Sequence, residues 1–367
     1  MPGRISSTLV AVSASVLVVA ACKQSSAPPG QEPAQPSAPA ATAAPGSPDR
    51  AQARQLFGTL PARFESATNP MTPAKLALGK QLYHDARLSK NQDVSCNSCH
   101  DVARFGVDGL PVSKGHKGQV GNRNSPTVFN AAGHASQFWD GRATDVEAQA
   151  KGPMLNPLEM AMKDEAAVVA IVESIPEYPP QFAAAFPGEA RPLTLDNVAR
   201  AIAAYERTLV TTSPFDAWLA GDDAALSPQS KQGLALFVGA GCTGCHAGPL
   251  LGGTMFMKLG LVRPYDNLRD TGRMEVTKAE VDRFAFKVPS LRNVARTAPY
   301  FHDGAIGDLP TAIAKMGELQ LGKAFSADEV RSIAAFLEAL TGQPPADVIA
   351  VPALPRSGKA TPKPDPT

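Results

Sequence analysis

The chain has few of the features that reveal a function at first reading. Aromatic residues make up only 6% of its 367 residues, and 35 basic side chains are balanced by 34 acidic ones. Proteins that bind a nucleic-acid backbone normally carry a basic excess, so nucleic acid is excluded as the main partner. A hydrophobic content of 44% is still enough for two domains that each bury a core.

Cysteine is also scarce, and its arrangement is informative. Four of the five cysteines form two CxxCH pentads, Cys96–His100 and Cys242–His246, and the fifth is Cys22. This arrangement leaves no cysteine for a structural disulfide. The chemistry of the protein is therefore expected at the two pentads.

The N-terminal residues 1–21 form an apolar leader that is too short to predict a membrane span. The leader ends in Val-Ala-Ala before Cys22, which resembles the lipobox of bacterial lipoproteins. We therefore expect export, with Cys22 lipidated and holding the protein at a membrane. Cleavage by the ordinary signal peptidase is the alternative.

Two segments are expected to lie outside the cores. Residues 22–50 begin with the lipidated cysteine, and from residue 23 onward they contain no Leu, Ile, Val, Met or aromatic residue. Their Ala and Pro content predicts a semi-extended tether. Residues 356–367 are also rich in proline and are expected to form a flexible tail.

Between these segments the sequence repeats itself. The two pentads are followed by matching blocks, Pro126–Asn130 and Pro289–Asn293. In each repeat an Asp-Gly pair begins ten residues after the Asn, at Asp140 and at Asp303. The same spacing twice indicates an internal duplication that yields two related domains.

The repeat predicts domains at residues 51–212 and 213–355. Apolar residues recur at helical spacing, as in Val198 and Ile202, and no segment alternates with a period of two. Helix start signals precede several of these segments: Thr72-Pro73, Ser227-Pro228, and Ser326 with Glu329 as a capping box. We predict a mostly α fold with two small helical domains.

The pentads indicate what the domains bind. The thiols of a CxxCH pentad lie about one helical turn apart, so they can bond to the vinyl groups of a heme while the histidine binds its iron. Zinc binding and a redox dithiol are the alternatives. The cysteine pairs of a zinc site are usually about 15 to 20 residues apart, whereas these pairs are 146 residues apart. We expect two covalently bound heme c groups, in two cytochrome c-like domains, attached through Cys96, Cys99 and His100 and through Cys242, Cys245 and His246.

The sixth iron ligand separates an electron carrier from an enzyme, because an enzyme needs one iron that can open to substrate. After the Ala-Xaa-Ala-Lys block, the second repeat has Met316 where the first has Gly152. We predict that Met316 is the axial ligand of the second heme. Packing in a core is the alternative for Met316, and Met154 is the competing ligand in the first domain.

Four further motifs, Ser136–Arg142, Asn156–Met160, Tyr300–Gly304 and Lys315–Gly317, closely resemble the bacterial di-heme cytochrome c peroxidase family (the cytochrome c peroxidase/MauG superfamily) over residues 59–355. The resemblance implies a periplasmic enzyme that reduces hydrogen peroxide to water with electrons from a small redox protein, a c-type cytochrome or a cupredoxin. It implies a low-potential peroxidatic heme in the first domain and a high-potential heme that receives electrons in the second. A homodimer is compatible with it.

The resemblance also implies roles for single residues. His116 matches the distal ligand of the peroxidatic iron, which leaves when the other heme is reduced. Gln149 and Glu159 match the distal-pocket pair, and Trp139 matches the residue between the hemes. The residues that match the calcium site between the domains are Asn124, Thr297 and Pro299.

These roles make chemical sense, although each residue has a simpler interpretation. Peroxide cleavage needs a group that moves a proton between the two oxygens, which Glu159 could do while Gln149 orients the peroxide. The simpler interpretations are a solvated acid for Glu159, an exposed loop histidine for His116 and a core aromatic for Trp139. We expect surface or structural positions for the other histidines, His84, His134 and His302.

Three other kinds of function remain open. A MauG-like oxidase of a protein substrate carries a Tyr ligand on its second heme, so Met316 argues against it. A non-catalytic di-heme electron carrier would keep both irons six-coordinate. A zinc-binding or adhesive lipoprotein is the most distant alternative.

Overall fold

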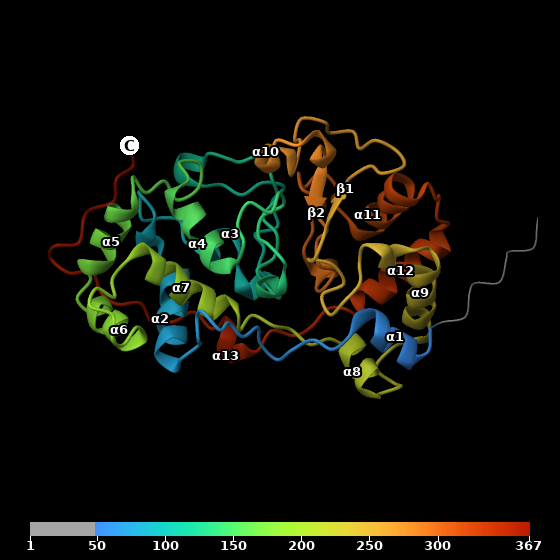
Figure 1. Cartoon of the computed structure of the whole chain (residues 1–367), viewed down its shortest axis with the longest axis horizontal. Coiled ribbons are helices and arrows are strands. Elements are labelled where there is room, and N and C mark those ends of the chain that lie inside the picture. The colour runs from blue at the N-terminus through green and yellow to red at the C-terminus, as the bar shows by residue number, and fades with distance from the viewer. Residues whose placement is uncertain (1–47) are drawn as a thin grey trace, which may run out of the picture. The chain divides into compact units, whose positions relative to one another are not determined.

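The computed structural model describes residues 48–367. Cys22 and its predicted lipid anchor lie outside the described residues, as does most of the tether. Within the described range the fold is mostly helical, which confirms the predicted class (Figure 1). No helix of this range is both long and apolar enough to cross a membrane.

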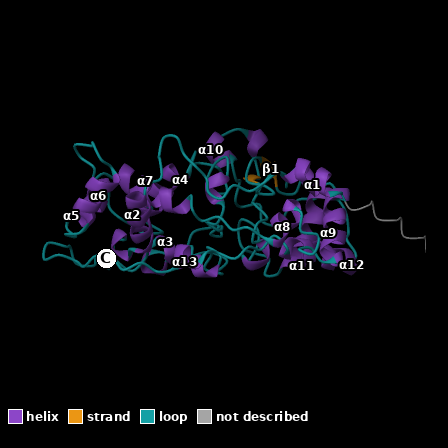
Figure 2. Ribbon diagram, turned by 90° about the horizontal axis from the view of Figure 1, so that it is seen from below, coloured by secondary structure: helices purple, strands orange, loops and turns teal. Residues whose placement is uncertain are grey.

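The regular elements are short and are joined by many loops (Figure 2). The α-helices are α1 (Arg50–Phe57), α2 (Pro73–His84), α3 (Cys96–Cys99), α4 (Val146–Leu155), α5 (Glu165–Glu173), α6 (Tyr178–Ala185), α7 (Leu195–Glu206), α8 (Pro214–Ala220), α9 (Pro228–Gly239), α10 (Met274–Thr277), α11 (Leu309–Met316), α12 (Ala327–Glu338) and α13 (Ala346–Ile349). The remaining short helices are η1 (Ala86–Leu88), η2 (Val102–Arg104), η3 (His116–Gly118), η4 (Ala131–Gly133), η5 (Cys242–Gly244), η6 (Glu280–Asp282), η7 (Val294–Arg296) and the π-helix η8 (Gly317–Leu321). The strands β1 (Phe256–Lys258) and β2 (Ala285–Lys287) pair in antiparallel fashion.

The predicted helix starts are built as the sequence indicates. Thr72, Ser227 and Ser326 each place a side-chain oxygen on a free backbone N–H of the first turn, at the start of α2, α9 and α12. Ser326 and Glu329 form a reciprocal capping box, in which Ser326 N donates to Glu329 Oε2 at 2.8 Å. These caps supply partners for N–H groups that a helix leaves unpaired.

Two helix crossings organise the hydrophobic core. In the α2–α7 crossing, a Cβ atom on Gly79 would lie 1.8 Å from Ala201 O, and in the α9–α12 crossing a Cβ atom on Gly233 would lie 1.8 Å from Ser332 O. Only glycine permits so close an approach of two backbones. The first crossing lies in one hydrophobic cluster and the second lies in another.

Buried asparagines join the loops that follow the two pentads to the connecting segment. Asn130 and Asn293 both adopt a left-handed backbone conformation, with φ of 62° and 61°. Both donate from Nδ2 to Thr211 Oγ1, at 3.3 Å and 2.9 Å respectively. Thr211 therefore fixes both loops at one buried point.

The ends of the described chain each pack on the more distant half of the sequence. Phe57 of α1 belongs to the hydrophobic cluster around α9 and α12. The predicted boundaries assign α1 to the first domain, but it packs with the helices of the second half. Val348 of α13 packs on the cluster around α2 and α7, and its carbonyl accepts a hydrogen bond from Tyr205 Oη at 2.9 Å.

The C-terminal segment 356–367, for which we predict a flexible tail, makes several contacts with the first half. Asp365 N donates to Lys90 O at 3.0 Å, and Gln92 Nε2 donates to Pro362 O at 2.8 Å. The red end of the chain accordingly lies beside α5 in Figure 1.

Candidate active site

A cavity of about 510 Å³ lies beside the first pentad. Its volume is typical of sites that hold a cofactor or another small molecule. It is walled by residues of both halves of the sequence. The predicted site residues that line it are Cys96, Cys99, His100, Asn124, Trp139, Gln149, Glu159, Thr297 and Pro299.

The first pentad presents a donor set that fits a covalently attached heme. The single turn of α3 carries both Cys96 and Cys99, and neither thiol is in a disulfide. Burial raises the pKa of Cys99 to about 11 and lowers the pKa of His100. A neutral imidazole is the form that binds a metal. Covalent attachment of a heme requires two thiols one turn apart, an imidazole for the iron and an adjacent cavity. The first pentad provides all of these.

The second pentad has a related geometry but lies outside this cavity. His246 Nδ1 donates to Leu251 O at 3.0 Å, which leaves Nε2 as the nitrogen that can bind a metal. Burial lowers the pKa of His246 and raises the pKa of Cys242 to about 11. This pentad also fits a heme c.

Met316 ends α11, where the π-helix η8 begins. It is half-buried and packs with Tyr265, Phe301 and Leu319. One turn earlier on α11, Ile313 belongs to the hydrophobic cluster against which Cys242 packs. The helix that carries Met316 therefore lies near the second pentad, and ligation by Met316 stays a prediction.

The first half has no methionine at the repeat position of Met316, although Met160 lines the cavity. Gly152 has no side chain, and the Phe138 ring lies 3.4 Å from where its Cβ would be. Met154, the competing ligand, is fully buried in the hydrophobic cluster around α2 and α7, and it does not line the cavity.

His116 is buried beside the cavity without lining it. Its backbone N–H donates to Glu159 O at 2.7 Å, and a Cβ on Gly115 would lie 2.1 Å from Leu158 O. Both ring nitrogens of His116 are buried and make no hydrogen bond within residues 48–367. The structure therefore packs this loop tightly on the Glu159 segment and leaves the imidazole without a partner.

Glu159 combines access to the cavity with a perturbed acidity. Burial raises its pKa, whereas a hydrogen bond from Asn156 and the charge of Arg142 oppose that rise. Asn156 Nδ2 donates to Glu159 Oε1 at 2.8 Å and so fixes the carboxylate. Gln149, on α4, lines the same cavity. A carboxyl group with a raised pKa is suited to accept and return protons.

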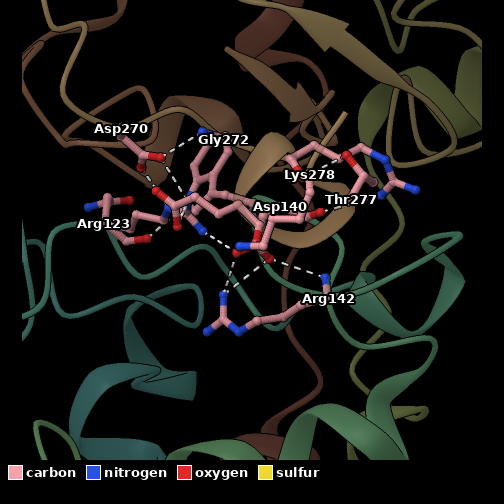
Figure 3. A network of polar contacts seen from close by, with 11 residues as sticks. Arg123, Asp140, Arg142, Asp270, Gly272, Thr277 and Lys278 are labelled. Carbon is pink, nitrogen blue, oxygen red and sulfur yellow. Dashed lines mark hydrogen bonds and ion pairs between the residues drawn. The ribbon is translucent and has the colours of Figure 1, made fainter. Parts of the chain in front are cut away.

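Trp139 is held from both halves of the chain. Its indole Nε1 donates to Asn124 O at 2.9 Å, and Lys287 N donates to Trp139 O at 2.7 Å. In the adjacent network of Figure 3, the Asp140 carboxylate accepts hydrogen bonds from Arg123 and from Arg142. These contacts fix the indole at the cavity wall.

The network of Figure 3 continues into the second half of the chain. Arg123 donates to both oxygens of Asp270, at 2.6 Å and 2.7 Å. Such a two-pronged pair is stronger and more directional than a single hydrogen bond.

The residues of the predicted calcium site line one cavity but form no acidic cluster. Asn124 Nδ2 donates to Leu110 O at 2.9 Å, so its Oδ1 remains available to a cation. Thr297 and Pro299 line the same cavity and could add carbonyl oxygens. Among the described residues, no group of three or more His, Cys, Asp or Glu side chains could hold a metal ion.

Two buried charged residues in the cavity wall, Glu206 and Lys287, are not indicated by the sequence. Glu206 is buried, and burial together with the charge of Glu147 raises its pKa to about 8. Lys287 is also buried and lines the cavity. Neither residue belongs to a local pattern that distinguishes it from a solvated charge, because its burial depends on distant segments.

Known proteins resemble this chain over most of its length. The family model for di-haem cytochrome c peroxidase matches residues 73–224. Cytochrome c551 peroxidase of Pseudomonas aeruginosa is 47% identical over 319 residues, which cover 85% of this chain and 91% of that protein. The methylamine utilization protein MauG of Methylorubrum extorquens is 39% identical, with 78% of this chain and 83% of that protein covered.

A solved structure supports the same grouping. The crystal structure of a MauG-like protein associated with microbial copper homeostasis is 30% identical and superimposes with a TM-score of 0.71. The match covers 80% of this chain and 95% of that protein. The similarity therefore extends to the arrangement of the helices.

Proposed function

The chain belongs to the di-haem cytochrome c peroxidase family, and we propose that it reduces hydrogen peroxide to water with electrons from a small redox protein, a c-type cytochrome or a cupredoxin. The observation that carries the proposal is the cavity that joins the first pentad to Glu159. When bound, the heme at Cys96 and Cys99 would supply the iron at which the O–O bond is reduced. The reaction consumes two electrons and two protons for each peroxide and yields two waters.

In this proposal, side chains of the cavity transfer the protons of the reaction. Glu159 takes a proton from the nearer peroxide oxygen and returns it to the leaving oxygen, and Gln149 orients the peroxide. Asn156 holds the Glu159 carboxylate in place through its 2.8 Å hydrogen bond. With a heme bound, His116 would be a ligand of the iron that can be released, and Trp139 would lie between the two hemes.

We also propose that two cytochrome c-like domains, 51–212 and 213–355, arose by duplication. The matched glycine crossings at Gly79 and Gly233 support this, as do the matched asparagines that meet at Thr211. In the second domain Met316 would be a ligand of the heme and would give it the higher potential, and the heme of the first domain would have the lower potential.

The proposed function is tested by mixing the two-heme protein with hydrogen peroxide and a reduced c-type cytochrome or cupredoxin. We expect the oxidation of two donor molecules for each peroxide. Heme content is measured separately, as the pyridine hemochrome. A protein that carries both hemes but consumes no peroxide with any such donor would contradict the proposal.

A MauG-like oxidase is the second candidate, because MauG proteins are among the relatives. The predicted Met ligand on the second heme argues for the peroxidase. The same mixture distinguishes the candidates, since an oxidase would modify a protein substrate instead of oxidising a soluble donor. A carrier would leave both peroxide and protein substrate unchanged.

The calcium site and the assembly complete the proposal. Asn124, Thr297 and Pro299 would bind one calcium ion between the domains through oxygen ligands. Metal analysis before and after treatment with a calcium chelator tests this site. Sedimentation of the purified protein tests whether it forms a homodimer.

Replacing His116 with glycine should open the peroxidatic iron even when both hemes are oxidised. The reason is that the parent would release this ligand only after the other heme is reduced. The measurement is cyanide binding to the fully oxidised protein, followed in the visible spectrum. Lys117→Gly is the matched control, because Lys117 is exposed in the same loop. Equal cyanide affinity in the parent and His116→Gly would remove His116 as the ligand.

Replacing Cys22 with serine should release the protein from the membrane fraction into the soluble periplasm. Lipoprotein processing adds more than one acyl chain, which is what stable anchoring requires. Immunoblots of the separated fractions measure the change. Retention of Cys22→Ser in the membrane fraction would contradict the anchor.

A further inference from the structure

Lys287 is a buried cation in the wall of the cavity. It ends β2, and only 7% of its surface is exposed. Its Nζ donates to Ser136 O at 2.8 Å and lies 3.1 Å from His134 Nδ1. Both partners come from the first half of the sequence, and neither is an anion. The hydrogen bonds of this lysine therefore join the two halves without neutralising its charge.

The surroundings of Lys287 do not balance its charge. Asp140 is the acidic group that raises its pKa, but the Asp140 carboxylate is hydrogen-bonded to Arg123 and Arg142. Burial is the larger effect and lowers the pKa of Lys287 to about 7. Among residues 48–367, no carboxylate forms an ion pair with Lys287. A buried charge normally requires such a partner.

The other cations of the cavity wall are already balanced. Arg123 pairs with Asp140 and Asp270. Arg142 pairs with Asp140, and its guanidinium lies 3.4 Å from the centre of the Phe138 ring. Lys287 is therefore the buried cation of this wall, among the described residues, that lacks a carboxylate.

We infer that Lys287 is the counter-ion of a carboxylate of the cofactor that this cavity takes. The inference rests on the proposed heme at the first pentad, because a heme carries two propionate carboxylates. The third N–H of the ammonium is available, since Ser136 and His134 occupy two. Lys287, a residue of the second half of the chain, thus binds an acid group of the cofactor that is attached to the first half.

This pairing has a consequence for electron transfer. Lys287 N donates to Trp139 O, and Val288 O, one residue further, accepts from Gly253 N at 2.7 Å. The end of β2 therefore links the Trp139 segment to the loop that follows the second pentad. A positive charge held here stabilises the added electron on the first heme and raises its potential.

Redox titration of three variants tests the inference. Lys287→Gln removes the charge, Lys287→Arg keeps it, and Lys258→Gln removes an exposed charge from the neighbouring strand β1. For Lys287→Gln we expect the reduction equilibrium of the lower-potential heme to fall about tenfold, which is about 59 mV for one electron. We expect Lys287→Arg and Lys258→Gln to stay near the parent. An unchanged potential in a Lys287→Gln protein that carries both hemes would overturn the inference.

A second measurement needs only the parent protein. Resonance Raman spectra of the first heme should contain a propionate bending band that shifts in deuterated water, because the N–H that donates to the propionate exchanges to N–D. A band that does not shift when the donating N–H becomes N–D would overturn the pairing even if the Lys287 variants fail to fold. Failure of the proposed function is seen differently, as a parent without heme at the first pentad or with heme but without peroxide turnover.

Discussion

Replacing Glu159 with glutamine should lower peroxide turnover by about 10² or more, the usual size of a lost general acid–base group. The amide cannot accept the proton that leaves the nearer peroxide oxygen, although it keeps the size of the side chain. Its oxygen can still accept the hydrogen bond from Asn156. Both heme spectra should therefore stay nearly unchanged while the rate falls.

The pH dependence of the parent should report the same group. Glu159 must be ionised to accept a proton, so turnover is present above its pKa and is lost as the pH falls through it. Burial raises that pKa, so the loss should begin at a higher pH than for an ordinary carboxyl group. In Glu159→Gln this acidic limb should disappear.

The control for Glu159→Gln is Glu173→Gln, an exposed acid at the end of α5. Steady-state turnover at saturating peroxide and donor is measured for the parent and for both variants. We expect Glu173→Gln to match the parent. A Glu159→Gln protein that turns over at the parent rate, with the acidic limb intact, would remove Glu159 as the proton carrier.

Local patterns in the sequence predict the helices well. The caps at Thr72, Ser227 and Ser326 depend on residues within one helical turn, and the structure confirms all three. The packing of α1 and of residues 356–367 was not predictable in this way. Their contacts join segments more than 100 residues apart, and no local periodicity encodes them.

The residues of the candidate site also differ in whether the sequence predicts their roles. The spacing of the two pentads predicts heme attachment, and the family motifs predict roles for Glu159 and Trp139. Glu206 and Lys287 carry no such signal, because a single charge in a helix or strand is normally solvated. Only the folded chain shows that both are buried in the wall of one cavity.

Replacing Met316 with histidine should abolish electron uptake from the external donor while both hemes stay attached. A thioether is a soft, neutral ligand that favours reduced iron, whereas imidazole is a stronger donor to oxidised iron. The potential of the second heme should therefore fall. Each drop of about 59 mV lowers the equilibrium for taking up one electron tenfold.

The division of labour between the two hemes depends on this ligand. Peroxide reduction needs two electrons, and one electron held on each bound heme would supply both without a long-lived radical. Met274→His is the matched control, because it places the same imidazole on α10 in the second half of the chain. A redox titration and donor-driven turnover are measured for the parent and for both variants. Equal potentials for the two hemes of the parent, or a Met316→His protein with an unchanged second potential and unchanged turnover, would exclude Met316 as the ligand. In that case the order of electron uptake would have to depend on a residue other than Met316.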